Sequence, residues 1–273
     1  MLKKMYKKIM VIALAIGVLS PLSAQGEPTL PGVEASLDFS STYMWRGYDA
    51  LVGKQDAAGD AREFFNFAPA VMPSFTINSP LEGLSFNIWG SYAMMSRADA
   101  DGGLRGADEI DFTASYEFDT TIGSFGVAYI LYAYPSSPAG LVESYGEVVG
   151  SYTIPVVLSP TFGIAAADGS GGSTEYLTFG ISHAIEFGNI SLEPSVTFGW
   201  WYYNAATSSN WGHVDVALPF SISVGDNLSF HITPLMVYRI FASNDDQYLD
   251  PNGSWKDRPA AIGAVTIGTA FSF

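Results

Sequence analysis

The sequence has 273 residues, with 27 acidic and 12 basic side chains, no cysteine and an apolar fraction of 48%. The net charge of −15 speaks against nucleic acid as a partner, and the lack of cysteine excludes disulfide cross-links. Beyond residue 24, no apolar run reaches the roughly 20 residues that a membrane-spanning helix needs, and no segment repeats convincingly at a period of 3.6. These features predict an all-β chain.

Residues 1–24 have the organisation of a secretory signal peptide. Four lysines within the first eight positions precede an apolar run over residues 9–19, and a segment of small residues ends at Ala24. The apolar run is too short to cross a hydrocarbon layer about 30 Å thick, which disfavours the alternative of a membrane anchor. We predict cleavage near Ala24 and a single domain over residues 25–273, where eight basic and 27 acidic residues give a net charge of −19.

Twelve later segments alternate apolar and polar residues at a period of two, which is typical of strands with one apolar face. They are residues 33–47, 65–78, 84–97, 108–119, 125–134, 145–154, 158–167, 175–187, 190–204, 211–224, 228–242 and 260–273. Pro69 and Pro73 indicate a bulge or an irregular centre in the second segment. Residues 145–154 and 158–167 are the least regular.

The connections alternate in length and the apolar faces exclude charge. Short turns at residues 79–83, 119–124, 155–157, 188–189 and 225–227 alternate with mostly longer connections. The apolar faces carry no Asp, Glu, Lys or Arg, and His183 is their one ionisable side chain. We predict a transmembrane antiparallel β-barrel of about 12 strands, with short periplasmic turns and longer extracellular loops. The alternative, a secreted β-sandwich, has strands of about five or six residues, which is shorter than many of these segments.

The opposite faces supply charged side chains that we expect in the barrel lumen or at its constriction. These candidates are Asp38, Arg46, Arg97, Asp111, Glu117, Glu193, Asp215 and Arg239. We expect Arg46 and Arg97 either to face lumen acids in a constriction or to pair with Asp38, Asp111 or Glu117 and fill the barrel. A second set of side chains is expected in the aromatic girdle at the outer rim. It comprises Tyr43, Trp45, Tyr129, Trp200, Tyr202, Trp211 and Tyr238.

The last segment ends on an aromatic residue. Phe271 and Phe273 resemble the end of the closing strand of bacterial outer-membrane barrels, where the terminal aromatic belongs to the signal read by the barrel assembly machinery. This likeness implies export to the outer membrane of a Gram-negative bacterium. The expected partners are outer-membrane lipid, lipopolysaccharide and the assembly machinery.

Several runs in the first half of the mature chain resemble the TorF family of outer-membrane porins. They are STYMWRG at residues 41–47, FAPAV at 67–71 with Phe75, NIWGSY at 87–92, and EIDF at 109–112 with Ser115 and Tyr116. The loop at residues 48–63 is longer than expected for that family. The resemblance implies a barrel and a pore, and it implies no substrate and no catalytic residues.

No arrangement of residues predicts an enzyme. The three histidines are His183, His213 and His231, none stands with a serine in a recognisable pair, and we predict polar lumen roles for the last two. Acidic residues gather at positions 99, 101, 108 and 109 and again at 245, 246 and 250, where calcium binding is an alternative to solvated loops. We predict no catalytic residue, no metal and no cofactor.

The predicted function is a narrow porin or channel for small polar solutes or ions. Twelve strands lie between barrels filled by side chains and barrels with an open channel, so the bulk of the inward side chains decides. Inward serines argue for space, while Trp89, Tyr132, Trp201 and Tyr203 argue for a plugged interior. The alternative is a closed barrel that displays extracellular loops as a binding, adhesion or structural protein.

Overall fold

A computed structural model describes residues 32–46, 48–49, 69–94, 109–135, 144–167, 174–203, 211–241, 247–249, 255–257 and 261–273. The chain divides into two compact units, Met1–Pro31 and Gly32–Phe273, and all described residues belong to the second. The predicted signal peptide therefore lies outside the described residues. The described part contains no helix that is long and apolar enough to cross a membrane.

The second unit is built from strands, whose bounds are as follows. They are β1 Val33–Ser40, β2 Met44–Trp45, β3 Tyr48–Asp49, β4 Ala70–Asn78, β5 Leu84–Ala93, β6 Glu109–Thr120, β7 Gly123–Ala133, β8 Tyr145–Thr153, β9 Thr161–Ala167, β10 Thr174–Ser182, β11 Ile185–Phe187, β12 Ile190–Leu192, β13 Ser195–Tyr203, β14 Trp211–Ala217, β15 Phe220–Val224, β16 Leu228–Phe241, β17 Gln247–Leu249, β18 Trp255–Asp257 and β19 Ala261–Ser272. Two pairs, β2 with β3 and β17 with β18, form small separate hairpins.

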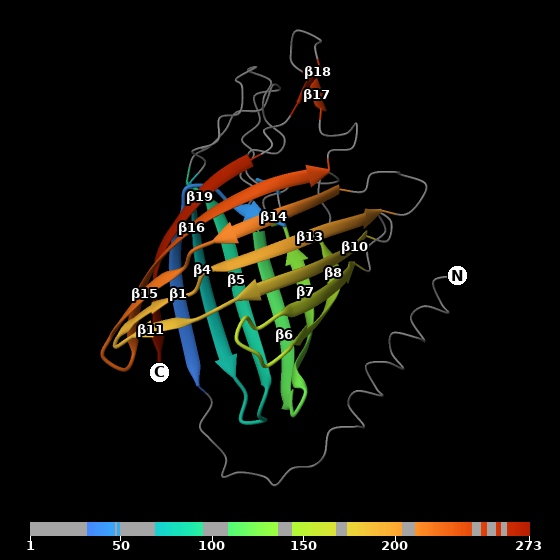
Figure 1. The fold of residues 1–273 in the computed structure, drawn as a ribbon. Helices are drawn as coiled ribbons and strands as arrows, with labels where there is room; N and C mark the ends of the chain where they lie inside the picture. The colour runs from blue at the N-terminus through green and yellow to red at the C-terminus, as the bar shows by residue number, and fades with distance from the viewer. Residues whose placement is uncertain are drawn as a thin grey trace. The chain divides into compact units, whose positions relative to one another are not determined.

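The remaining strands form a closed antiparallel β-barrel. From β4 to β10 each strand pairs with its neighbours in sequence, and β1 pairs with β4. Strand β19 closes the wall because it pairs with β1 on one side and with β16 on the other. When the halves of three interrupted strands are joined, the described wall has 12 strands, as the sequence predicts. Figure 1 shows the wall, with β19 beside β1 and β16.

Three predicted strands are interrupted where prolines lie side by side. The segments 175–187, 190–204 and 211–224 become β10 and β11, β12 and β13, and β14 and β15. At the breaks, the amides of His183, Glu193 and Leu218 donate to the carbonyls of Pro194, Pro219 and Pro234. Proline has no N–H to donate to a ladder, so the regular pairing stops at this row and resumes beyond it.

Pro73 has a smaller effect than the sequence indicates. In the β4–β5 ladder, Val71 pairs with Tyr92 and Ser74 pairs with Trp89, so the register is the same on both sides of the proline. Only Met72 and Pro73 lack a partner in β5. The predicted irregularity is therefore a local gap in the pairing and not a shift of register.

The barrel is apolar outside and polar inside. Large apolar side chains on its outer face are more than one-third exposed, among them Phe39, Phe86, Ile88, Phe112, Phe162, Phe230 and Ile267. The alternate positions turn inward, and the buried polar residues include Ser40, Ser91, Glu109, Glu147, His213 and Arg239. The prediction that the apolar faces carry no acidic side chain is wrong at one position. Glu175, near the start of β10, shares its outer face with Leu177 and Phe179.

The short turns and the last residue lie at one end of the wall. Turns after β4, β6, β11 and β15 are short, and Gly188 and Gly225 adopt the left-handed conformation at two of them, with φ of 64° and 70°. Phe273 is paired with Val33, since its N–H donates to the Val33 carbonyl at 2.8 Å. The closing strand is therefore held by backbone bonds up to Phe273. Figure 1 marks this end of the chain with the letter C.

Candidate functional site

The chain leaves the barrel wall after β1 and turns into the interior. The last backbone hydrogen bond to the closing strand comes from Ser41, whose N–H donates to the Val265 carbonyl at 2.9 Å. Ser40 Oγ then donates to the Thr42 carbonyl at 2.6 Å, and Thr42 is 1% exposed. We call residues 41–46 the inward segment. The sequence predicts a strand continuing to residue 47, and this part of the prediction is wrong.

The inward segment moves two predicted girdle residues to the inside of the barrel. Tyr43 is 8% exposed and packs on Ala70 and Met72, and its ring lies 5.3 Å from that of Trp89. Trp45 packs in the same interior, with its ring 5.2 Å from Trp201. The prediction that Tyr43 and Trp45 face the outer rim is therefore wrong. Aromatic side chains that look lipid-facing in the sequence fill the lumen instead.

The inward segment ends in a bidentate ion pair with the barrel wall. Arg46 Nη1 donates to Glu147 Oε1 at 2.7 Å, and Nη2 donates to Oε2 at 2.5 Å. Glu147 stands on β8 and is 2% exposed, and Tyr132 Oη donates to its Oε2 at 2.9 Å. Both carboxylate oxygens are therefore engaged, which is the geometry that holds a guanidinium most specifically.

Aromatic rings surround the same guanidinium. The Arg46 Cζ lies 4.6 Å from the ring centroid of Tyr176, 4.9 Å from that of Trp45 and 5.4 Å from that of Trp201. All three distances are within the range of cation–π attraction. Trp201 Nε1 also donates to the Arg46 carbonyl at 3.1 Å. The arginine is thus fixed by its side chain and by its backbone.

The environment of Arg46 favours its charged form. Burial alone would lower the pKa of the guanidinium. The hydrogen bonds and the charge of Glu147 outweigh this effect and raise the pKa above its ordinary value. The inward segment therefore carries a permanent positive charge into the interior.

A second group of acids lies on the inner face of β6. Glu109 is 7% exposed and stands directly opposite Ser91 of β5, and Asp111 stands opposite Trp89. Among the described residues, the Oγ of Ser91 and the Oδ1 of Asp111 are buried without a hydrogen-bond partner. The sequence groups Glu109 with the loop acids although its predicted strand begins at residue 108, and the structure makes it the first residue of β6, with its side chain buried.

A buried histidine links β10 to β14. His213 is 0% exposed, its Nδ1 donates to Asp215 Oδ1 at 2.7 Å, and its Nε2 lies 2.9 Å from the Tyr176 hydroxyl. Gly199 makes this contact possible, because a Cβ there would lie 2.2 Å from Nε2. With both ring nitrogens engaged, this imidazole offers no atom to a substrate. Its visible role is to hold the Tyr176 ring under Arg46.

The other predicted lumen residues are spread over the interior. Asp38 faces His231 across the closing strand, with 2.9 Å between its Oδ1 and the His231 Nε2. Arg239 is buried on β16, while Glu117 and Glu193 are exposed. Arg97 lies outside the described residues. The structure therefore joins Arg46 to Glu147, which is none of the three acids that the sequence offers as its partner.

The predicted girdle is only partly visible in the described residues. Tyr129 and Tyr238 are 44% and 49% exposed on the outer face, and Trp200 stacks on Phe198, which follows Val196 along that face. The side chains of Tyr202 and Trp211 lie outside the description. Phe271 and Phe273 are exposed and stack on each other near the end with the short turns.

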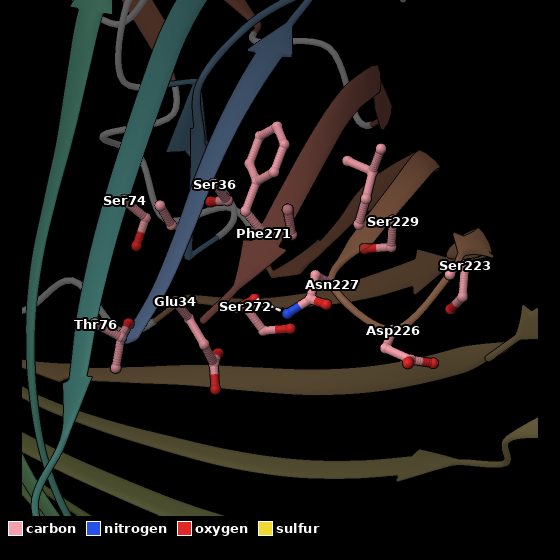
Figure 2. A pocket seen from close by; sticks show the side chains of 14 residues that line it. Glu34, Ser36, Ser74, Thr76, Ser223, Asp226, Asn227, Ser229, Phe271 and Ser272 are labelled. Atoms are coloured by element: carbon pink, nitrogen blue, oxygen red, sulfur yellow. Dashed lines mark hydrogen bonds between the residues drawn. The ribbon is translucent and has the colours of Figure 1, made fainter. Parts of the chain in front are cut away.

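A polar hollow opens at the end of the barrel with the short turns (Figure 2). Its volume is about 330 Å³, and its lining combines the hydroxyls of Ser36, Ser74, Thr76, Ser223, Ser229 and Ser272 with Glu34, Asp226 and Asn227. Asn227 Nδ2 donates to the Ser272 carbonyl at 2.6 Å. The hollow contrasts with the opposite half of the interior, where Trp201, Tyr132 and Glu147 are nearly inaccessible.

The residues that sequence reasoning missed are Glu147 on β8, which is one of the two least regular predicted strands, and Tyr176 on β10. On β8 the outward positions include Gly146 and Gly150, which have no side chain, so the alternation that marks Glu147 as inward is faint. Tyr176 looked like an ordinary wall residue because only its long-range contacts with Arg46 and His213 give it a role. Among the described residues, no group of three or more His, Asp or Glu side chains is placed to hold a metal ion.

Comparison with known proteins gives a limited result. No protein-family model and no curated protein matches the chain. Similar solved structures include OmpT of Vibrio cholerae, an outer membrane protein folded in vitro, at 8% identity and a TM-score of 0.37 over 89% of this chain and 96% of that one. The outer membrane protease OmpT from Escherichia coli is 12% identical, with a TM-score of 0.35 over 93% of this chain and 99% of that one.

A third similar structure is the anion-selective porin from Comamonas acidovorans. It is 10% identical, with a TM-score of 0.32 over 89% of this chain and 98% of that one. These three proteins come from the outer membrane or form a pore, but they are too distant to carry an argument about this chain. The fold rests on the strand pairing, and the function on the site itself.

Proposed function

We propose that this chain is an outer-membrane β-barrel that acts as a narrow channel for small polar solutes or ions. Support for the membrane location comes from the outer face, where contiguous apolar side chains such as Phe86, Ile88 and Phe112 are about half exposed. Apolar patches of this extent mark contact with lipid or with partners. The resemblance to the TorF family, drawn from the runs around Trp45 and Trp89, agrees with a pore-forming barrel.

The observation that carries the channel proposal is the inward segment. It brings a charged group, Arg46, and the rings of Tyr43 and Trp45 into a polar interior. Channels select their solutes by charged side chains arranged around the pore and by constrictions that side chains form. Because Asp38, Glu109, Asp111, Glu147 and Asp215 face inward against Arg46 and Arg239, we expect a preference for cations.

The experiment is single-channel conductance of the refolded mature chain in a planar bilayer. Reversal potentials under a salt gradient report selectivity. Defined openings with cation preference support the proposal, and anion preference overturns the selectivity that we assign. Protein that inserts but passes no current overturns the channel.

A closed barrel that displays its loops is the second candidate. One observation favours it: Tyr132, Glu147 and Trp201 are 2% to 3% exposed, so the half of the interior around them is densely filled. Deletion of residues 48–63 or 243–259 would then abolish binding without changing permeability. The expectation that the chain is not an enzyme stays a prediction, and it agrees with a His213 whose ring nitrogens are both engaged.

A further inference from the structure

Four wall residues form a preformed site for a flat cation. Glu147, Tyr132, Tyr176 and Trp201 stand on β8, β7, β10 and β13, and we call them the guanidinium cage. The wall ladders fix their backbones, and Tyr132 and His213 fix the Glu147 carboxylate and the Tyr176 ring by hydrogen bonds. None of these contacts involves Arg46, so the wall itself positions the cage residues.

Arg46, which occupies the cage, is attached in a different way. It comes from the inward segment, whose only strand, β2, has two residues and pairs with the two-residue β3. Its backbone has a φ of 46°, in the left-handed region that non-glycine residues avoid at a cost of about 1 to 3 kcal/mol. Contacts of the Arg46 side chain and carbonyl with the wall thus hold a strained and weakly paired segment in place.

We propose that the guanidinium cage is a recognition site for the guanidinium group of a small solute, and that Arg46 occupies it as a built-in competitor. The solute class follows from the chemistry of the cage. A two-oxygen carboxylate accepts two parallel N–H bonds, and two aromatic faces bind a weakly hydrated cation. A neutral solute lacks the positive charge that strengthens both interactions, and an anion is repelled by the carboxylate.

The inference has two halves. The binding half concerns the folded barrel alone. The transport half, in which such a solute displaces Arg46 and passes the constriction, rests on the proposed channel function. The two halves need different readouts, so that failure of one is not mistaken for failure of the other.

Chemical rescue of Arg46→Gly tests the binding half. Glycine removes the side chain and adopts the positive φ of residue 46 without strain, and the Trp201 Nε1 bond to the residue 46 carbonyl does not need the side chain. The variant is folded in detergent and titrated with ethylguanidinium chloride, with ethylurea as the neutral isostere and sodium chloride as the salt control. We expect saturable binding by calorimetry and a rise in the melting temperature with ethylguanidinium only. The same titration of Arg46→Gly combined with Glu147→Gln should show binding at least about tenfold weaker.

Two further measurements keep the test decisive. If Arg46→Gly does not fold, Arg46→Gln keeps the bulk of the side chain without its charge and is titrated in its place. In the wild-type chain Arg46 competes from within, so we expect binding at least about tenfold weaker than in the variant. Equal responses to ethylguanidinium and ethylurea in a folded variant overturn the proposal. So does binding that survives Glu147→Gln.

Current recordings test the transport half. Ethylguanidinium added to an active wild-type channel should carry current or cause brief blocks, and Arg46→Gly should lengthen those blocks. If the barrel binds ethylguanidinium but conducts no current, the proposed channel function is wrong, while the proposed binding by the cage stands. A channel that conducts sodium and shows no response to ethylguanidinium refutes the transport half.

Discussion

His231 Nε2 lies 2.9 Å from Asp38 Oδ1, and the two side chains meet over Gly268 of the strand that closes the barrel. A Cβ at Gly268 would lie 2.0 Å from Asp38 Oδ1 and 2.6 Å from His231 Nε2. The pair bridges β1 and β16, which are not themselves neighbours in the wall. The closing strand thus needs a residue without a side chain at this position.

We expect Gly268→Ala to separate this pair and to lower the free energy of unfolding by about 1 to 2 kcal/mol. The strand register should survive, because the atoms in the way are the ends of two side chains. Gly150→Ala is the matched control, since its Cβ would meet only Ile164 Cγ2 at 3.4 Å. Urea unfolding in lipid vesicles measures both variants. Equal effects would show that the space at Gly268 is not required.

Glu147→Gln should be among the most damaging single substitutions in the interior. It leaves the buried Arg46 guanidinium without its counter-charge, and breaking a buried ion pair from one side costs about 3 to 5 kcal/mol. Glu82→Gln, in the exposed turn after β4, is the control and should change stability by less than about 0.5 kcal/mol. The urea midpoints of the refolded variants give the comparison. A Glu147→Gln variant as stable as the control would mean that the ion pair does not hold the inward segment.

The wall of the barrel was predictable from the sequence because strands with one face toward lipid and the other toward a polar lumen must alternate apolar and polar side chains. Leu37 and Asp38 of β1 show this alternation, and the other regular strands repeat it. The inward segment was not predictable by the same rule. Tyr43 and Trp45 continue the alternation of β1, and a local pattern is the same whether the apolar side faces lipid or a packed interior. Contacts with distant residues decide between them, among them the ion pair of Arg46 with Glu147, which is 101 residues away from it.

The strand breaks and the acids show the same limit. Prolines at 194, 219 and 234 are visible in the sequence, but their alignment across neighbouring strands depends on the register, which local pattern does not give. Glu109 lies at the border between a polar loop and a predicted strand, and only its pairing with Ser91 of β5 shows that the residue belongs to the wall. Long-range pairing therefore determines the site, while the short-range period determines the wall.

Tyr176→Phe tests the link between the buried histidine and the cage. Loss of the hydroxyl removes the 2.9 Å contact with His213 Nε2, and we expect a loss of stability of about 1 kcal/mol. Tyr129→Phe removes the same group from an exposed ring on the outer face and is the control. Thermal melts in detergent compare the two. If the control loses as much, the hydroxyl of Tyr176 has no special role.

Trp45→Ala should widen the constriction. The indole fills the interior against Trp201, so its removal leaves space beside Arg46 and should raise the single-channel conductance at least about twofold if pore width limits it. Trp200→Ala makes the same change on the outer face and should leave the conductance unchanged. Unchanged conductance in a folded Trp45→Ala variant would place the limiting width elsewhere in the barrel.

A charge on the outer face tests whether that face meets lipid. Ile88 is 49% exposed near the middle of β5, where an arginine would have to enter hydrocarbon at a cost of about 2 to 4 kcal/mol. Leu81 is 61% exposed in the short turn between β4 and β5, outside the apolar band, so Leu81→Arg should fold as the wild type does. Folding yield in vesicles, read from the mobility of unheated samples on gels, should fall for Ile88→Arg alone. Full yield for Ile88→Arg would mean that water covers this face, and the membrane location would be lost with it.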